Sequence, residues 1–172
     1  RWTRAALQDE HDFLRELAAA EVPAVAPLAD AAGQTLHEEG GICFALFPRM
    51  GGRPCAEPSR DEWRQIGRLL GRIHQVGAQK SAPNRLTLGP QESSRTHVAF
   101  LRDSGALPRE VAGRYLDAAE RLLDRIAPLF AGVARQRLHG DLHRMNLLWR
   151  PGEGFLAIDF DAAQGVVDDD IA

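Results

Sequence analysis

The chain has 172 residues, which is enough for one domain, or for one domain and part of another. Its 44% hydrophobic content is typical of a globular core and excludes a disordered chain, and its net charge of −3 gives no electrostatic basis for binding nucleic acid. Cys43 and Cys55 are isolated, and there is neither a signal-peptide pattern nor a run of about 18 apolar residues, so we expect a cytoplasmic protein that does not bind a membrane.

The first predicted element is a helix over residues 3–20. Thr3 can cap its N-terminus, and the apolar residues that follow recur at helical spacing: Leu7, Phe13, Leu14 and Leu17. After a Pro-interrupted extended stretch we expect three short antiparallel strands, over residues 28–31, 35–38 and 42–47. The first part of the chain is therefore predicted to be one helix followed by a small sheet.

A second helix is predicted to start near residue 60. Ser59 and Glu62 have the spacing of a capping box, and apolar residues recur after them: Trp63, Ile66, Leu69, Leu70, Ile73 and Val76. Gly67 and Gly71 lie one turn apart in this helix, where each costs about 1 kcal/mol of helix propensity. We expect these two glycines to allow close packing against another helix.

Two further helices are predicted after a loop over residues 79–92. The first covers residues 94–103 and carries no chemical motif. The second starts at Pro108, whose missing N–H suits a helix start, and it runs to about residue 130. Its apolar face is formed by residues at helical spacing: Val111, Tyr115, Leu116, Ala119, Leu122, Leu123 and Ile126.

One stretch near the C-terminus carries the residues of a phosphoryl-transfer site. Phosphoryl transfer needs a carboxylate that orients the attacking hydroxyl, and hard oxygen ligands that hold Mg²⁺ on the phosphates. Asp141 can supply the carboxylate, and Asn146 and Asp159 can supply the metal ligands. The His-x-Asp-x-x-x-x-Asn spacing that starts at His139 matches the catalytic loop of protein kinases, with Gly140 where that loop usually has Arg.

A predicted hairpin connects the two parts of this stretch. Residues 147–149 and 155–158 are apolar and would form its strands, with Gly152 and Gly154 in the turn. The hairpin would bring Asn146 and Asp159 to the same end, where one metal ion could bind both.

Three polar neighbours of these residues are also candidates for a role in the site. His139 is expected to brace the loop by hydrogen bonds. His143 could face either the substrate or solvent, and Asp161 could be a further metal ligand or simply a polar residue.

The chain resembles the aminoglycoside phosphotransferase/choline kinase branch of the protein-kinase-like fold. That branch has His-Gly-Asp, as in residues 139–141, where protein kinases have His-Arg-Asp, and its metal segment is similar to residues 158–161. Within the branch, the chain is most similar to a bacterial kinase of protein serine and threonine. The similarity covers nearly the whole chain, and its other markers are Arg1-Trp2, Asp9-Glu10-His11, Glu21-Val22-Pro23, Gly33-Gln34-Thr35-Leu36, Phe44-Ala45-Leu46-Phe47-Pro48, Gly51-Gly52-Arg53, Leu70-Gly71-Arg72-Ile73-His74-Gln75 and Asn146-Leu147-Leu148-Trp149-Arg150.

The resemblance implies an α+β, bilobal, protein-kinase-like fold. Residues 1–50 would form a partial N-lobe, with the hinge at about residues 47–52. Residues 53–172 would form a partial helical C-lobe, with the catalytic loop at residues 139–146 and the metal-binding segment at residues 155–161.

The resemblance also implies that the sequence is a fragment. The family's first N-lobe strands, with a Gly-rich loop and a phosphate-binding lysine, would precede Arg1, and its C-terminal helices would follow Ala172. The chain's only lysine, Lys80, has the sequence context of a surface loop. The acidic run at residues 168–170 resembles the start of the family's next helix, so we do not expect a metal cluster there.

Three residues near the N-terminal end receive roles by the same resemblance. Phe47 would shape the adenine pocket, and the Met50 N–H would donate a hydrogen bond to the adenine; the alternative is that this stretch is a plain exit from the strand into a loop. Glu10 would pair with the phosphate-binding lysine; the alternative is that Glu10 is a solvated helix charge.

The expected function is that of a monomeric kinase that uses ATP and Mg²⁺, with Asp141 as the catalytic base. The acceptor would be a protein serine or threonine, or alternatively a small-molecule hydroxyl, as in aminoglycosides, choline or homoserine. A metal-dependent hydrolase that uses the nearby histidines and aspartates as ligands, and a non-catalytic binding module, are the competing interpretations. Because the Gly-rich loop and its lysine are absent, we expect residues 1–172 alone to have little or no kinase activity.

Overall fold

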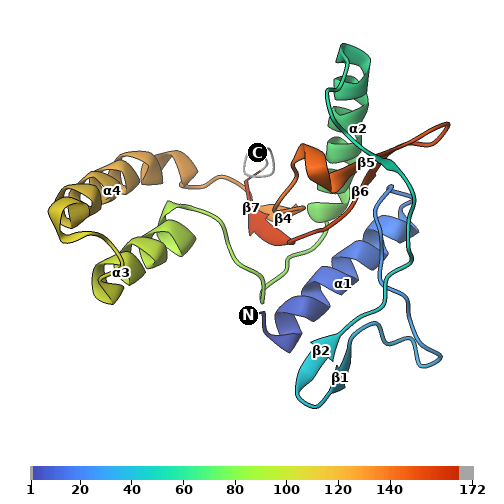
Figure 1. Ribbon diagram of the computed structural model, residues 1–172, viewed down its shortest axis with the longest axis horizontal. Coiled ribbons are helices and arrows are strands. Elements are labelled where there is room, and N and C mark those ends of the chain that lie inside the picture. Colours follow the sequence, from blue (N-terminus) through green and yellow to red (C-terminus); the bar gives the residue numbers. More distant parts are fainter. Residues whose placement is uncertain (1, 167–172) are drawn as a thin grey trace.

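The computed structural model describes residues 2–166 of the chain. Its helices are α1 (Arg4–Ala19), α2 (Arg60–Gly77), α3 (Arg95–Ser104) and α4 (Arg109–Phe130), with a π-helical turn η1 (Pro90–Ser94) and a 3₁₀ turn η2 (Arg144–Asn146). Its strands are β1 (His37–Glu39), β2 (Ile42–Phe44), β3 (Arg53–Pro54), β4 (Gln136–Leu138), β5 (Leu147–Arg150), β6 (Gly154–Ala157) and β7 (Ala163–Gly165). The strands form three small sheets, β1-β2, β3-β5-β6 and β4-β7. In Figure 1, α1 and α2 lie with the last two sheets, whereas the β1-β2 hairpin and the α3-α4 pair extend in different directions.

Local capping signals determine where α1 and α2 begin. The Thr3 hydroxyl accepts a hydrogen bond from the N–H of Ala6 at 3.1 Å, which satisfies one of the free donors of the first turn of α1. Ser59 and Glu62 form the predicted capping box, in which each side chain accepts from the backbone N–H of the other residue. Both helices were therefore predicted correctly to within about a residue at the N-terminal end.

The N-terminal sheet has two of the three predicted strands. β1 and β2 pair antiparallel, with His37 opposite Phe44. Residues 28–31 do not form a strand, and the prediction for this segment was wrong. The Asp30 carboxylate accepts hydrogen bonds from the N–H groups of Ala32 and Gln34, at 2.8 and 2.9 Å, and this local turn competes with pairing along the sheet.

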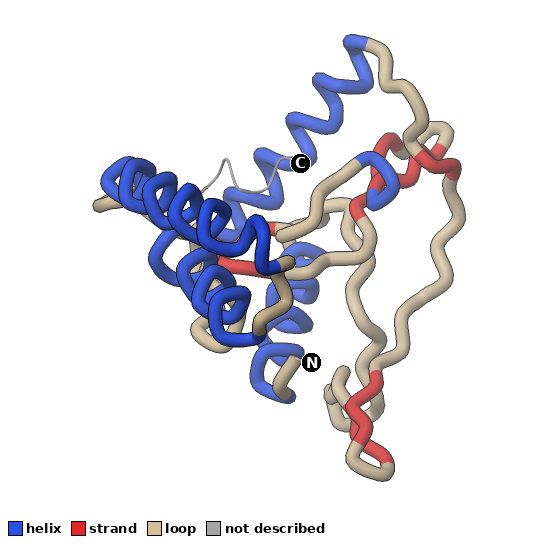
Figure 2. Tube along the Cα trace, turned by 60° about the vertical axis from the view of Figure 1, so that its left-hand side comes forward, coloured by secondary structure: helices blue, strands red, loops and turns tan. Residues whose placement is uncertain are grey.

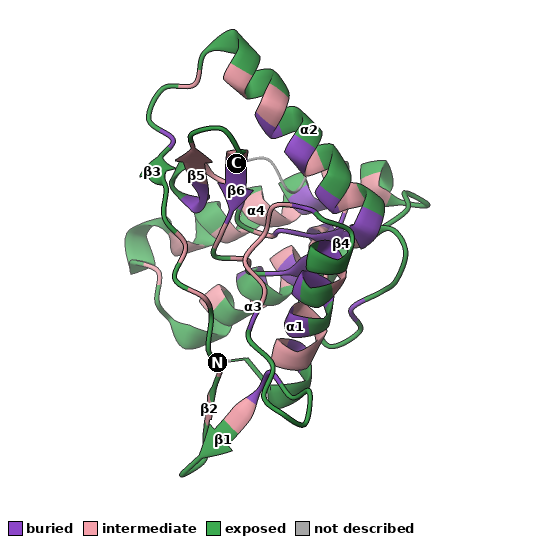
Figure 3. Ribbon diagram, turned by 90° about the vertical axis from the view of Figure 1, so that its right-hand side faces the viewer, coloured by how far each residue is buried: buried purple, intermediate pink, exposed green. Residues whose placement is uncertain are grey.

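The hydrophobic core lies between α1, α2 and the β5-β6 hairpin. Phe13 and Leu17 of α1 and Ile73 of α2 are completely buried in it. Figure 3 shows that α1 and α2 each have a buried face, in purple, and an exposed face, in green. The predicted hairpin is present, with Leu147 opposite Ala157, and β3 pairs with the outer side of β5. The core therefore supports β5, which follows the candidate metal ligand Asn146, and β6, which precedes the candidate metal ligand Asp159.

Two short strands that were not predicted enclose the site segment. β4 pairs antiparallel with β7, with Leu138 opposite Ala163. β4 leads directly into the loop at residues 139–146, and β7 follows directly after the segment at residues 158–161. This pairing therefore holds the two polar segments of the site together at their outer ends.

The α3-α4 pair is largely exposed, with one buried residue in each helix among the described residues. Arg95 and Arg102 of α3 both form ion pairs with Glu120 of α4, at 2.7 and 2.6 Å. Figure 2 shows this pair as neighbouring helices. The predicted apolar face of α4 is mostly uncovered, because Leu123 is its one buried residue within the described part of the chain and Leu122 is 57% exposed.

The expected role of the two glycines of α2 was also wrong. A Cβ added at Gly67 or Gly71 would have open space around it among the described residues, so neither position is a close helix contact.

None of the helices within residues 2–166 is both long and apolar enough to cross a membrane. The acidic run at residues 168–170 lies outside the described residues.

Candidate active site

Gly140 has a conformation that explains why the loop has His-Gly-Asp. Its φ is +88°, in the region where a side chain is strained, and a Cβ at this position would collide with the backbone carbonyl of Asp161. The glycine thus lets the loop at residues 139–146 and the segment at residues 158–161 approach each other at backbone distance. The N–H of Asp161 also donates to the carbonyl of His139 at 3.0 Å, which joins the two segments directly.

His139 braces these two segments, as predicted. It is completely buried, and its ring stacks on Phe160 with 4.0 Å between centroids. Its Nδ1 is 3.3 Å from the N–H of Asp141 and its Nε2 is 3.0 Å from the carbonyl of Ile158, so Nδ1 accepts and Nε2 donates. Since both ring nitrogens are used in these bonds, His139 cannot also be a metal ligand in this arrangement.

Asp141 and Asn146 lie side by side on the loop. The Asn146 amide nitrogen donates to the carbonyl of Asp141 at 2.9 Å and lies 3.4 Å from its carboxylate Oδ2. Asn146 is buried, whereas half of the Asp141 side chain is exposed. His143 Nε2 is 3.6 Å from Asp141 Oδ2, so His143 lies beside the predicted base.

Asp159 follows β6 in an unusual backbone conformation. Its φ is +57°, which is uncommon for a residue other than glycine and is often found where a functional group must be aimed. The N–H of Ile158 donates to the carbonyl of Asn146 at 3.0 Å, so the two predicted metal ligands are neighbours across the start of the hairpin.

The donor set formed by Asn146 and Asp159 suits Mg²⁺. Because the Asn146 amide nitrogen is used in bonds to Asp141, its amide oxygen is the atom left for a cation. An amide oxygen and a carboxylate are hard ligands, and Mg²⁺ in phosphate sites takes one or two protein ligands and completes its shell with phosphates and water. Within residues 2–166 no group of three or more His, Cys, Asp or Glu side chains could hold a metal ion, so such an ion would need these further oxygens.

A cleft of about 380 Å³ contains four of the six predicted site residues: Glu10, Phe47, Met50 and Asp159. Its other walls are mainly apolar and come from α1, the hairpin and the segments around them: Leu14, Val25, Pro48, Leu148, Ile158 and Phe160. Asp141 and Asn146 do not line this cleft. They lie on the adjoining loop, connected to it by the backbone bond between Asn146 and Ile158.

Phe47 contacts His11, a residue to which the sequence pattern assigned no role of its own. His11 meets Phe47 edge to face, with 6.0 Å between the ring centroids. Its Nδ1 is 2.9 Å from the hydroxyl of Thr35, and both side chains are buried. Burial lowers the pKa of His11, so the neutral ring is favoured.

Glu10 is a buried acid with one cationic partner among the described residues. Its side chain is 14% exposed, and Oε2 lies 3.1 Å from Nη1 of Arg85, so the alternative of a solvated helix charge was wrong. Burial raises the pKa of Glu10 to about 7, because the loss of hydration outweighs the attraction to Arg85, and Asp161 and Asp159 act in the same direction as burial.

Arg85 was missed because nothing in its sequence context marks it. It lies in the loop after α2, where arginine is normally a surface residue. The predicted surface position of Lys80 is correct: its side chain is 65% exposed and pairs with Glu16 at 2.6 Å.

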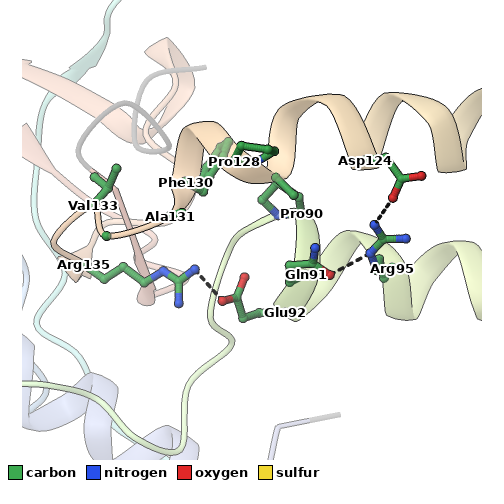
Figure 4. Close-up of a pocket in the computed structure, with 12 residues that line it drawn as sticks. Pro90, Gln91, Glu92, Arg95, Asp124, Pro128, Phe130, Ala131, Val133 and Arg135 are labelled. Atoms are coloured by element: carbon green, nitrogen blue, oxygen red, sulfur yellow. Dashed lines mark hydrogen bonds and ion pairs between the residues drawn. The ribbon is translucent and has the colours of Figure 1, made fainter.

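A second, larger cavity lies apart from the predicted site residues, between η1, α3 and the end of α4. It has a volume of about 620 Å³, and its charged residues pair with each other across it (Figure 4). Arg135 contacts Glu92 and Arg95 contacts Asp124, both at 2.5 Å.

Comparison with known proteins identifies relatives along almost the entire chain. The family described as "Phosphotransferase enzyme family" matches residues 1–164. Stress response kinase A of Escherichia coli (strain K12) is 36% identical over 166 residues, which are 96% of this chain and 50% of that protein. A protein named "Serine/threonine protein kinase RdoA", from Salmonella typhimurium (strain LT2), has the same identity and coverage. The chain thus spans about half the length of the curated relatives it matches.

A solved structure shares the fold. An amicoumacin kinase, hAmiN, solved with AMP-PNP, Ca²⁺ and Ami, superposes with a TM-score of 0.75 at 18% identity, covering 98% of this chain and 52% of that one. This likeness and the family match over residues 1–164 together confirm the predicted aminoglycoside-phosphotransferase-like fold. With the family match over residues 1–164 and the His-Gly-Asp, Asn and Asp residues in place, the chain belongs to the phosphotransferase enzyme family.

Proposed function

We propose that this chain is part of an ATP-dependent kinase, which transfers the γ-phosphoryl group of ATP to a hydroxyl and uses Mg²⁺. The observation that carries the proposal is that Glu10, Phe47, Met50 and Asp159 line one cleft, although they are far apart in the sequence. We also propose that the protein is cytoplasmic and monomeric, as the sequence predicts.

The cleft offers a separate surface for each part of a nucleotide. Phe47 and Met50, with the apolar walls, suit an adenine ring, and the backbone N–H of Met50 is the predicted donor to it. Asn146 and Asp159 would hold Mg²⁺, which supplies positive charge that neutralises the phosphate oxygens during transfer. Glu10, on the α1 side of the cleft, would orient a phosphate-binding lysine by an ion pair.

Asp141 would act on the acceptor. Its exposed carboxylate can accept the proton of the acceptor hydroxyl as the hydroxyl oxygen forms its bond to the γ-phosphorus and the bond to the leaving ADP oxygen breaks. The bonds from Asn146 to Asp141 hold this carboxylate on the loop and orient it.

A protein serine or threonine is the proposed acceptor. The support is the 36% identity to relatives that include one named a serine/threonine protein kinase. A small-molecule hydroxyl is the second candidate, since the chain shares its fold with an amicoumacin kinase, and the 620 Å³ cavity beside α3 and α4 is within the size range of small-molecule sites.

The geometry argues against the two other interpretations. A hydrolase that used His139 as a metal ligand would need a ring nitrogen that is instead hydrogen-bonded to the protein. A non-catalytic module would have no need for an Asn146 side chain that is hydrogen-bonded to Asp141, with Asp159 close to Asn146.

The test is phosphoryl transfer by the full-length protein. Labelled ATP and Mg²⁺ are supplied with a generic protein acceptor and, separately, with aminoglycosides, choline and homoserine. Label on protein supports the leading proposal, and label on a small molecule alone supports the second candidate. Asp141→Asn should abolish transfer and retain nucleotide binding, whereas Asp117→Asn, an exposed carboxylate of α4, should leave both unchanged. Unchanged turnover of Asp141→Asn would refute its role as the base.

A further inference from the structure

Arg85 is a fully buried arginine at the point where three segments of the site meet. Its side chain is 0% exposed, although it belongs to the loop between α2 and η1. Lysine and arginine are almost never fully buried unless they are paired, so a buried guanidinium on a loop needs an explanation.

The loop that carries Arg85 is bound to both sides of the site. On one side, the Asn84 backbone and amide nitrogens donate to the carboxylate of Asp9 on α1, at 2.8 and 3.2 Å. On the other side, the loop runs along β7, where Leu88 N–H donates to the carbonyl of Gln164 at 2.7 Å and Gln164 N–H donates to the carbonyl of Leu86 at 2.9 Å. The loop therefore bridges α1 and the strand that follows the metal segment.

The guanidinium of Arg85 also bridges α1 and the segment before β7. Nη1 lies 3.1 Å from Oε2 of Glu10 on α1, an ion pair without an aligned hydrogen bond. Nη2 donates to Oδ1 of Asp161 at 2.8 Å, and Nε donates to the carbonyl of Ala162. The ring of Trp2 covers the guanidinium, with 3.9 Å between its central carbon and the ring centroid.

A guanidinium fixes the distance between two carboxylates that it binds, whereas the ammonium group of lysine would not. Its donors are held in one plane at fixed angles, so a side chain that contacts two carboxylates also sets how far apart they lie. One of those carboxylates is on Glu10, and the other is two residues after Asp159, on a segment that is hydrogen-bonded to His139 of the catalytic loop.

We infer that Arg85 is a positioning residue, which holds α1 and the 158–161 segment in register so that Glu10 and Asp159 face the same Mg²⁺–nucleotide complex. This inference rests on the proposed function and adds to it a residue that touches neither the phosphates nor the metal.

Mg²⁺-dependent nucleotide binding by the full-length protein tests the inference, with the fluorescent nucleotide mant-ADP as the probe. Arg85→Met should raise the Mg²⁺ concentration at half-saturation about 10-fold, the usual scale of coupling between linked groups. The direction of this change in the Mg²⁺ concentration at half-saturation is informative, because simple removal of a positive charge near acidic ligands would instead tighten Mg²⁺ binding. Arg85→Lys, which keeps the charge and loses the planar fork, should show a smaller shift in the same direction.

Arg137 provides a matched control. It is also a buried arginine that pairs with α1, through Glu16 at 2.7 Å, and it bonds the carbonyls of Val76 and Gly77, away from the metal segment. Arg137→Met should lower the melting temperature and leave the Mg²⁺ dependence unchanged.

The outcomes separate the inference from the proposed function. A wild-type protein whose nucleotide binding does not depend on Mg²⁺ would overturn both. A Mg²⁺-dependent wild type with an unshifted or tighter Arg85→Met, or with equal shifts in Arg85→Met and Arg137→Met, would overturn the positioning role alone. If Arg85→Met does not fold, Arg85→Lys decides, and wild-type Mg²⁺ dependence of that variant overturns the role.

Discussion

Replacement of Gly140 by alanine should destabilise the protein and displace the catalytic loop. Two effects act at this position, since φ is +88° and the new Cβ would collide with the carbonyl of Asp161. The collision would also disturb the bond from Asp161 N–H to the carbonyl of His139. The variant should therefore lose both stability and turnover.

Two other glycines separate the two effects. Gly132 has φ +75° with open space where a Cβ would lie, so Gly132→Ala should cost only the conformational term of roughly 1–2 kcal/mol. At Gly77, where φ is not positive, a Cβ would collide with the carbonyl of Arg137, so Gly77→Ala should cost the overpacking term of roughly 1–3 kcal/mol. Since Gly140→Ala combines the two, the sum is roughly 2–5 kcal/mol.

The assay is urea unfolding of the three variants and the wild type, followed by circular dichroism. A loss in Gly140→Ala no greater than that in Gly132→Ala would refute the close approach of the loop to Asp161. Turnover adds a second criterion: Gly140→Ala should be impaired even at a temperature where it is fully folded, whereas Gly132→Ala should not.

The remaining predictions concern Glu10 and the isolated chain. The pKa of Glu10 is raised from 4.5 to about 7, so the fold favours its neutral form, and its contribution to stability is complete below pH 4.5 and is lost as the pH rises through about 7. Glu10→Gln in residues 1–172 should therefore raise the melting temperature at pH 8 and change it little at pH 4.5, and a difference that is constant with pH would contradict the buried state of Glu10. Residues 1–172 alone should show little or no phosphoryl transfer, and robust transfer by this chain would overturn that expectation.

The helices could be predicted because their signals are local. The Thr3 cap and the Ser59 capping box each lie within three residues of the backbone groups that they satisfy. Pro108 marks the start of α4 by a different local signal, since it directly precedes the helix, where its missing N–H costs no hydrogen bond. The strand predicted over residues 28–31 failed for a related reason: the Asp30 side chain forms a turn with its own neighbours, and the alternating pattern does not reveal that competition.

The strands β4 and β7 could not be predicted. Each has three residues, which is too short for a periodic pattern, and each is stabilised by a partner about 25 residues away along the chain. The exposed apolar face of α4 shows a similar limit, since helical spacing predicts the existence of a face and does not predict what covers it.

The sequence by itself determined which chemical groups the candidate site contains, and the tertiary structure decided how those groups are held. The spacing of Asp141, Asn146 and Asp159 predicts a base and two metal ligands, because it matches the catalytic-loop pattern of kinases and supplies the oxygen groups that phosphoryl transfer needs. The position of Arg85 between α1 and the metal segment comes from contacts between residues more than 70 positions apart, which local propensity cannot encode. A buried charge is stable only where the whole fold brings its partners together, so such residues become visible only in three dimensions.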